Sequence, residues 1–409
     1  MTIEFREYDP DRDFACAARI WREVGWLGKD EGERLRWYAE ESRGVVAVVD
    51  GEVECFVLMT DGRLRYQESH LPMAACTGVT TGRAARRLGL ARRALARSLV
   101  GEVRRGALVA GLGVFEVGFY DALGYGSGSC QRWAQVDPAH LRIGVRPRPA
   151  ARLTPDDWEE MHAARIGRRR CHGVCDLLPA CITRSEVADG DRGFGLGYRD
   201  AARGRLSHFV YFTTGSAEQG PYRAELIYRT VDELRELLAL VKSLGDQVLS
   251  VTLREPPGMI LQDWLDRPFR HMNVTEGGKH EWRIRSAAYH QFRILDLQRC
   301  VGALRLPGAN LSFNLRLTDP MEAYAEETSW SGLGGDYIIS FGEVSTCSPG
   351  ANTDLPTLHA SVNAFTRLWL GVGPASGLQV ADDLNAPAEL LQSLDDVLRL
   401  PVPQPDWDF

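Results

Sequence analysis

The stretch Thr80-Thr-Gly-Arg-Ala-Ala-Arg-Arg-Leu-Gly-Leu-Ala91 decides how this sequence is interpreted. It follows the segment from Met73 to Thr81, whose residues are typical of a β-strand, and it opens a long helix rich in arginine. Between Thr81 and Gly106 there are eight arginines and a single acidic residue, Glu102. The pattern predicts a strand, a turn and a cationic helix.

The first arginines of this stretch lie where positive charge is unfavourable. Arg83, Arg86 and Arg87 come near the expected helix N-terminus, at which the helix dipole is already positive, so an anion should compensate them. Gly82 and Gly89 allow a ligand to approach the backbone closely at the same place. The pattern therefore predicts a pyrophosphate site, with free N–H groups at the start of the helix as donors.

The arginine helix has two other interpretations. In the first it is a solvated helix, because Leu88, Ala91, Leu95 and Leu99 form an apolar stripe and most arginines lie off it. In the second it binds nucleic acid. The chain has 48 basic and 55 acidic residues, a net charge of −7, and the helix has no interleaved aromatic side chains on which bases stack. Nucleic acid and anionic membrane surfaces are therefore not expected partners.

The length of 409 residues predicts several domains, since one domain usually has about 150 residues. We expect three, at residues 1–145, 146–286 and 287–409. Arg146-Pro-Arg-Pro is the expected first linker, and Thr154-Pro-Asp-Asp after it is a weak repeat of Asp9-Pro-Asp-Arg-Asp.

The expected elements alternate between strands and helices in all three parts, which predicts mixed α/β sheets. The first part should have the order β-α-(α)-β-β-β-α-β-α-β, ending near residue 145. In the second we expect strands at His208–Thr213, Ala224–Tyr228 and Val248–Leu253, with a capped helix from Thr230 to Leu244. In the third we expect helices at Ile294–Leu304, Leu358–Trp369 and Ala388–Leu400, and strands at Leu311–Leu317 and Tyr337–Phe341.

The sequence gives no sign of a signal peptide or membrane span, so we expect a cytoplasmic protein. Its nine cysteines are an odd number, which favours reduced thiols. Cys171, Cys175 and Cys181 cluster with His172, but their spacing matches no common zinc pattern, and we expect no metal.

Two motifs resemble those of a known family. Arg86-Arg87-Leu88-Gly89-Leu90-Ala91 fits the Arg/Gln-x-x-Gly-x-Gly/Ala pattern of the GNAT N-acetyltransferases and follows a strand, as in that family. Phe119-Tyr120-Asp-Ala-Leu-Gly124-Tyr125 resembles the family's Phe/Tyr-Tyr-x-x-x-Gly-Phe/Tyr element. This resemblance implies acetyl-CoA as co-substrate.

The whole chain is more narrowly similar to the enhanced intracellular survival (Eis) acetyltransferases. The similarity rests on segments such as Tyr222-Arg-Ala-Glu-Leu-Ile-Tyr-Arg-Thr-Val and on the ending Asp408-Phe409. It implies tandem GNAT domains, the second without its own acetyl-CoA motif, followed by a sterol-carrier-protein-2-like α+β domain. It also implies a homohexamer.

The resemblance assigns roles to individual residues. It implies that Arg86 and Arg87, with the backbone around Gly89 and Leu90, bind the CoA pyrophosphate. It also implies that N–H groups at Val79 and Thr81 donate hydrogen bonds to the thioester oxygen.

On the catalytic side, the resemblance assigns the role of general acid to Tyr120 and that of general base to the carboxylate of Phe409. Trp26 and Asp408 are the expected substrate-binding residues. Gly25-Trp26 stands where aminoglycoside-binding members have an acidic residue before an aromatic one. The expected reaction is acetyl transfer to a primary amine of a small aminoglycoside-like molecule or of lysine. The alternative is a sterol-carrier-like protein that binds an apolar ligand on a GNAT scaffold.

Overall fold

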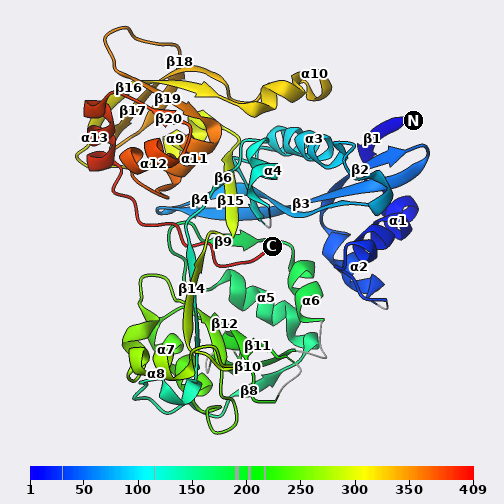
Figure 1. Cartoon of the computed structure of the whole chain (residues 1–409), viewed down its shortest axis with the longest axis vertical. Helices are drawn as coiled ribbons and strands as arrows, with labels where there is room; N and C mark the ends of the chain where they lie inside the picture. The colour runs from blue at the N-terminus through cyan, green and yellow to red at the C-terminus, as the bar shows by residue number, and fades with distance from the viewer. Residues whose placement is uncertain (30, 115, 189–192, 201–203, 216–217) are drawn as a thin grey trace. The chain divides into compact units, whose positions relative to one another are not determined.

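The computed structural model describes residues 1–409 except 30, 115, 189–192, 201–203 and 216–217 (Figure 1). The chain forms two compact units. The first contains Met1–Ser129, Cys171–Pro179 and Ala288–Phe409, and the second contains Cys130–Arg170 and Ala180–Ala287. Each is described by itself.

The first unit contains an eight-stranded sheet in the order β1-β2-β3-β4-β5-β15-β6, with β9 paired to β3. β4 and β5 pair in parallel, while the other neighbours pair antiparallel. Its strands are β1 (Ile3–Glu7), β2 (Arg43–Val49), β3 (Glu52–Tyr66), β4 (Ser69–Thr81), β5 (Val109–Gly113), β6 (Gly126–Ser127), β9 (Cys175–Leu177) and β15 (His290–Ile294). Its helices are α1 (Pro10–Glu23), α2 (Gly32–Glu40), α3 (Leu90–Arg105) and α4 (Val117–Asp121).

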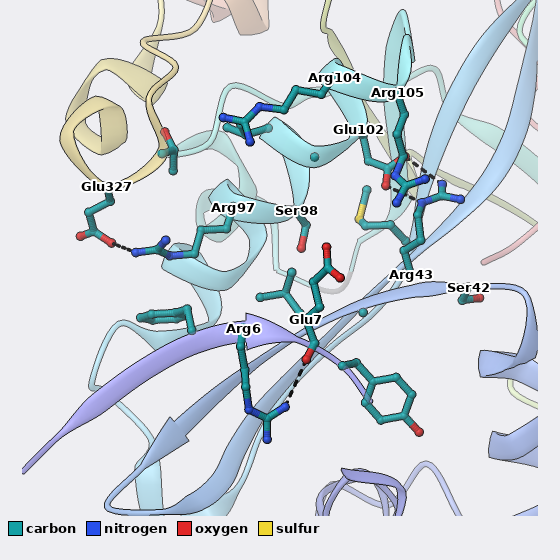
Figure 2. Close-up of a pocket in the computed structure, with 18 of the residues that line it drawn as sticks. Arg6, Glu7, Ser42, Arg43, Arg97, Ser98, Glu102, Arg104, Arg105 and Glu327 are labelled. Atoms are coloured by element: carbon teal, nitrogen blue, oxygen red, sulfur yellow. Dashed lines mark hydrogen bonds and ion pairs between the residues drawn. The ribbon is translucent and has the colours of Figure 1, made fainter. Parts of the chain in front are cut away.

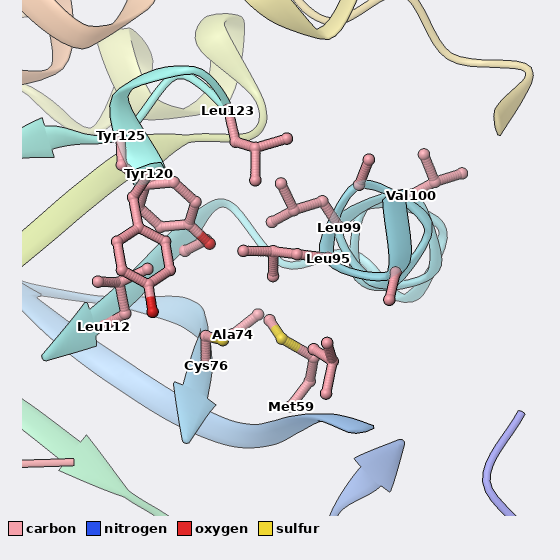
Figure 3. Close-up of a cluster of buried hydrophobic side chains, with 14 of the residues drawn as sticks. Met59, Ala74, Cys76, Leu95, Leu99, Val100, Leu112, Tyr120, Leu123 and Tyr125 are labelled. Carbon is pink, nitrogen blue, oxygen red and sulfur yellow. The ribbon is translucent and has the colours of Figure 1, made fainter. Parts of the chain in front are cut away.

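The arginine-rich helix is shorter than the sequence predicts. A one-turn 3₁₀ helix at Arg83–Ala85 comes first, and α3 begins only at Leu90, after Gly89 in the left-handed conformation. Leu88 is therefore exposed and lies outside the helix rather than on its apolar stripe. Leu95 and Leu99 are fully buried, and Figure 3 shows them facing the sheet together with side chains of β3, β4 and β5.

Strand β15 corrects the expectation that a helix begins at Ile294. All five residues of His290–Ile294 are buried, and they pair with β5 and β6 of the first sheet. The helix that follows, α9 (Leu297–Ala303), is capped by Asp296, whose side chain accepts the N–H of Arg299. The sheet of the first unit is thus completed by residues that we expected in the third domain.

The rest of the first unit is a five-stranded sheet in the order β18-β17-β16-β19-β20, with helices α9 to α13. The segment Leu358–Trp369 is not one helix, because it begins in β19 and the helix starts only after Ser361, whose side chain caps it. The remaining elements are β16 (Asn310–Thr318), β17 (Gly335–Gly342), β18 (Thr346–Pro349), β19 (Thr357–Ser361), β20 (Leu384–Asn385), α10 (Ala325–Thr328), α11 (Val362–Leu370), α12 (Ala375–Ala381) and α13 (Ala388–Val397).

The second unit has a seven-stranded sheet in the order β14-β7-β13-β12-β11-β10-β8. Thr230 and Glu233 form the predicted capping box at the start of α7. The elements are β7 (Gln131–Val136), β8 (Ala151–Leu153), β10 (Gly193–Arg199), β11 (Leu206–Thr213), β12 (Tyr222–Ile227), β13 (Val251–Arg254), β14 (Arg283–Ala287), α5 (Trp158–Ile166), α6 (Ala180–Val187), α7 (Val231–Lys242) and α8 (Pro268–Thr275).

Strand β7 lies in this second sheet, although we expected it to belong to a first domain ending at residue 145. It pairs with β13 on one side and β14 on the other, so the second unit begins at Cys130. In the part of the chain that the structure describes, no helix is long and apolar enough to cross a membrane.

Candidate active site

A cavity of about 1130 Å³ opens in the first unit between the end of β4, the start of α3 and α4. It collects most of the residues that the sequence singles out. Of the ten predicted site residues, eight line it: Trp26, Val79, Thr81, Arg86, Arg87, Gly89, Leu90 and Tyr120.

The geometry of β4 creates the opening. β4 and β5 pair only as far as Cys76 and Leu112, while β4 continues to Thr81 along β3. At the same point the pairing of β3 with β4 slips by one residue, because Thr77 is an extra residue opposite Leu58 and Met59. Such a bulge bends a strand and increases its twist, so the two parallel strands part here.

The backbone direction of β4 follows from one hydrogen bond. The N–H of Gly82 donates to the carbonyl of Glu54, on the β3 side, at 2.8 Å. Because successive N–H groups of a strand point to opposite sides, those of Val79 and Thr81 point away from β3, toward the side on which β5 has ended. They are oriented to donate to a ligand lying between the parted strands.

The turn before α3 provides further donors. Gly89, at φ +73°, is the N-cap of α3, and no side chain within the described ranges caps this helix, so its first N–H groups are free of a side-chain acceptor there. Arg87 has φ +66°, a conformation in which a residue with a Cβ is strained. The turn presents backbone N–H groups and the positive end of a sixteen-residue helix at the cavity wall.

The arginines of this turn differ from those further along α3. Arg93 and Arg97 form ion pairs with Glu327. Arg86 and Arg87 line the cavity, are exposed, and have no carboxylate partner among the residues that the structure describes. This pair of uncompensated cations beside an uncapped helix start can hold a pyrophosphate.

Tyr120 lies in α4 at the wall of the cavity and is itself buried. Within the described residues its hydroxyl has no hydrogen-bond partner, so it is available to a ligand. Figure 3 shows its ring beside that of Tyr125, and the centroids are 6.1 Å apart. Burial raises the pKa of Tyr120, with smaller contributions from Cys76 and Tyr289, so the phenol stays protonated well above neutral pH.

The C-terminal tail returns to this sheet. The backbone N–H of Gly113, the last residue of β5, donates to the carboxylate of Phe409 at 3.0 Å. Gly113 has room for nothing larger than hydrogen, because a Cβ there would clash with that carboxylate and lie 2.7 Å from the ring of Tyr289. Phe409 and Asp408 do not line the cavity. The carboxylate of Phe409 contacts Gly113, which follows Leu112, and Leu112 is the last residue of β5 that pairs with β4.

The tail is fixed along its length. Trp407 is completely buried, and its carbonyl lies 3.0 Å from Nε2 of His290 in β15. The N–H of Gln404 donates to the carbonyl of His172 at 2.8 Å, and the hydroxyl of Ser129 donates to the carbonyl of Pro403. These contacts place the carboxylate in one position, as a reacting group requires.

Tyr289 lies beside the end of β5. Its carbonyl accepts the N–H of Val114 at 2.7 Å, and its ring would lie 2.7 Å from a Cβ at Gly113. Its phenol is also one of the smaller causes of the raised pKa of Tyr120.

A second cavity in the first unit, of about 580 Å³, lies between β1, β2 and the last turns of α3 (Figure 2). It is charged, but two of its arginines are already paired with carboxylates. Arg6 pairs with Asp13, and Arg43 pairs with Glu102 and Asp61. It is therefore a weaker candidate for binding an anion than the cavity at the start of α3.

Sequence reasoning missed Gly113, His290 and the bulge at Thr77. A signal for Gly113 exists, because a glycine within a strand often marks a close approach of another backbone. The bulge and the anchoring of the tail by His290 depend on pairing between distant segments and have no local signal. The roles expected of all ten site residues, including Trp26 and Asp408, stay predictions.

The comparisons with known proteins agree with this geometry. Residues 6–128 match the family model described as an acetyltransferase (GNAT) domain, so the chain carries an acetyltransferase domain of the GNAT class. No curated protein matches the chain in sequence.

Solved structures resemble the chain over its full length. A probable N-acyltransferase from Enterococcus faecalis is 17% identical with a TM-score of 0.80, and a GCN5-related N-acetyltransferase from Anabaena variabilis is 14% identical with a TM-score of 0.79. Eis1 from Mycobacterium abscessus is 16% identical with a TM-score of 0.76. In each comparison 100% of both chains is covered. These similarities confirm the predicted tandem α/β fold with a further C-terminal part.

Proposed function

We propose that this protein transfers an acetyl group from acetyl-CoA directly to a primary amine. One observation carries the proposal: Arg86 and Arg87, without carboxylate partners, adjoin the uncapped start of α3 in the cavity that Tyr120 also lines. When bound, acetyl-CoA supplies an activated thioester. The residues that would hold it are Arg86 and Arg87 with the backbone of Gly89 and Leu90 at the pyrophosphate, and the N–H groups of Val79 and Thr81 further along.

The proposed catalytic roles divide between two ends of the site. The N–H groups of Val79 and Thr81 stabilise negative charge that develops on the thioester oxygen, because donors fixed in advance need no reorganisation during the reaction. Tyr120 donates its phenolic proton to the departing thiolate, and its raised pKa keeps that proton available.

The carboxylate of Phe409 is the proposed base. An alkyl amine with a pKa of about 10.4 arrives protonated and must lose a proton before it attacks. The hydrogen bond from Gly113 orients the carboxylate at the end of β5, and the buried Trp407 prevents the tail from moving away. We propose that Trp26, which is 42% exposed at the cavity, and Asp408 meet the incoming amine, on an aminoglycoside-like molecule or on lysine.

Calorimetry with acetyl-CoA tests the binding half of the proposal. Wild-type protein should bind at micromolar concentrations. Arg86→Ala and Arg87→Ala should each weaken binding by about 10-fold or more, since a charge-assisted hydrogen bond contributes about 1.5–3 kcal/mol. Arg104→Ala, an exposed arginine at the other end of α3, is the matched control and should bind normally. Absence of binding by folded wild-type protein would falsify the proposal.

The acceptor is tested by release of CoA. A panel of aminoglycosides, lysine peptides and simple polyamines, each incubated with acetyl-CoA, should include amines that release CoA faster than buffer does. If acetyl-CoA binds but no amine accelerates the release of CoA, the proposed transfer to amines is wrong, whereas the proposed acetyl-CoA site is retained.

A further inference from the structure

The second unit carries a cluster of metal-ligand side chains that is separate from the residues of the proposed acetyl transfer. His140, Asp266 and His271 each offer one ligand atom, and these atoms all lie within 4.8 Å of one another. Among the described residues this is the one group of three or more His, Cys, Asp or Glu side chains with such spacing. The cysteines at 171, 175 and 181 are not part of it.

Backbone pairing brings His140 next to Asp266. The N–H of Asp266 donates to the carbonyl of His140 at 3.0 Å. One residue further, Leu141 and Leu265 form an isolated β-bridge, and the N–H of Arg142 donates to the carbonyl of Trp264 at 2.7 Å. Two segments far apart in sequence are thus held in register at this point.

The third member comes from α8. Arg267, between Asp266 and the helix, has φ +46°, a left-handed conformation that is strained in a residue with a Cβ. The first helical hydrogen bond runs from the N–H of His271 to the carbonyl of Arg267 at 3.2 Å. This strained turn brings His271 back over Asp266, although the two are five positions apart in sequence.

Both imidazoles are held by one aromatic side chain. The ring of His271 stacks on Trp282 at 4.5 Å and 26°, and that of His140 meets Trp282 edge-on at 5.4 Å. The two imidazole centroids are 4.1 Å apart. No hydrogen bond to either ring occurs among the described residues, so their nitrogens are available as ligands.

We propose that His140, Asp266 and His271 bind a divalent d-block metal ion, with Zn²⁺ as the first candidate. Two imidazoles and one carboxylate are a common protein ligand set for zinc, with water at the fourth position. Zinc bonds of about 2.0–2.1 Å place two tetrahedral ligand atoms about 3.3 Å apart, so atoms that now lie within 4.8 Å of one another have to approach by at most about 1.5 Å. The ion would join residues 138–142, 264–267 and α8 into one block.

Two features compete with metal binding, and both are weak. Packing on Trp282 alone explains why the rings are close, but not why Asp266 adjoins them at a strained turn. Arg267 approaches the carboxylate of Asp266 at 4.0 Å, but both side chains are more than half exposed, and such a pair contributes little.

Titration with ZnCl₂ tests the site in the full-length protein after treatment with EDTA. All variants carry Cys130→Ser, because Cys130 is an exposed free thiol and thiolates are zinc ligands. The parent should bind one equivalent that is lost in His140→Ala and His271→Ala and weakened at least tenfold in Asp266→Asn. His359→Ala, an exposed histidine in β19, is the control and should bind as the parent does.

Thermal unfolding gives an independent readout. Zn²⁺ should raise the Tm of the parent and of His359→Ala, because a ligand that binds only the folded state stabilises it, and should leave the Tm of the double variant His140→Ala/His271→Ala unchanged. Circular dichroism without metal shows whether the variants fold. The site is refuted if the parent binds no zinc, or if folded His140→Ala and His271→Ala bind it with the parent's affinity and stoichiometry.

Discussion

The backbone N–H of Gly113 donates a 3.0 Å hydrogen bond to the carboxylate of Phe409, so the last residue of the chain meets the last residue of β5. This contact occurs immediately after Leu112, the last residue of β5 that pairs with β4. If the carboxylate is the base, as we propose, catalysis depends on the free end of the chain.

Deleting Phe409 should therefore abolish turnover while acetyl-CoA still binds. The penultimate Asp408 would then end the chain, and its α-carboxylate would fall one residue short of Gly113. Loss of a general base reduces kcat by about 10²–10⁴-fold. Steady-state kinetics and calorimetry on the same preparation separate the two effects, and a C-terminal tag should act in the same way while an N-terminal tag does not. Normal turnover by either altered C-terminus would remove the carboxylate from the mechanism.

Gly113→Ala should displace the carboxylate without altering its chemistry. A Cβ at this position would clash with the carboxylate of Phe409 and with the ring of Tyr289, so we expect kcat to fall at least tenfold. Gly101→Ala in α3 is the matched control, because no atom lies within 4 Å of the added Cβ. Both variants are measured for kcat and for the denaturant midpoint. Equal kcat values for the two would show that the position of the carboxylate is unimportant.

The sequence predicted much of this site because its decisive part is local. The strand, the glycine turn and the arginines from Arg83 to Arg87 are contiguous in the sequence. The prediction of an anion site at the start of the helix therefore depends only on their order along the chain. The predicted start of α3 was wrong. Because Arg87 and Gly89 have left-handed conformations, the helix begins only at Leu90. Three prolines after Leu400 are incompatible with continuing the helix, and residues 401–409 contain no helix or strand.

What the sequence did not predict depends on pairing between distant segments. β15 completes the first sheet, yet His290, Gln291 and Arg293 in it are polar and fully buried, which contradicts the apolar pattern expected of such a strand. The place of β7 in the second unit's sheet was not predicted either, because the strands with which it pairs, β13 and β14, are more than a hundred positions further along the chain. The three-domain division, the sterol-carrier likeness and the hexamer stay predictions.

Tyr120→Phe should lower kcat by about 10²–10⁴-fold if the phenol is the general acid. Tyr125→Phe is the matched control. Its ring is 6.1 Å from that of Tyr120, and its buried hydroxyl has no hydrogen-bond partner among the residues that the structure describes, so its removal should leave kcat unchanged. Because burial raises the pKa of Tyr120, the acid stays protonated as pH rises through the ordinary tyrosine value of about 10. The pH profile of wild-type kcat should therefore show no fall near that value, and a fall there that Tyr125→Phe retains would contradict the assignment.

Arg87 combines a functional charge with an unfavourable backbone conformation, and the two can be measured separately. Arg87→Gly and Arg87→Ala both remove the charge, so both should weaken acetyl-CoA binding equally. At φ +66° glycine is unstrained and alanine is not, so the free energy of unfolding should be about 1 kcal/mol higher for Arg87→Gly. Urea denaturation measures this difference. Equal stabilities would mean that the turn relaxes when the side chain is removed.

Replacing Arg293 should lower the free energy of unfolding more than replacing any other charged residue. It is fully buried in β15, pairs with the fully buried Asp319 at 2.5 Å, and donates to the carbonyl of Leu123 just after α4, the helix of Tyr120. Arg293→Met leaves the carboxylate of Asp319 buried without its cation, which costs about 3–5 kcal/mol. Arg316→Met breaks an exposed pair with Asp336 and should cost less than about 1 kcal/mol.

A second substitution distinguishes the buried charge from lost packing at Arg293. Arg293→Met/Asp319→Asn removes both charges, so it should recover part of the stability that Arg293→Met loses, measured as the free energy of unfolding in urea. If the destabilisation of the double variant equals the sum of those of Arg293→Met and Asp319→Asn, the two residues act independently and the pair does not hold β15 to the residue that follows β16.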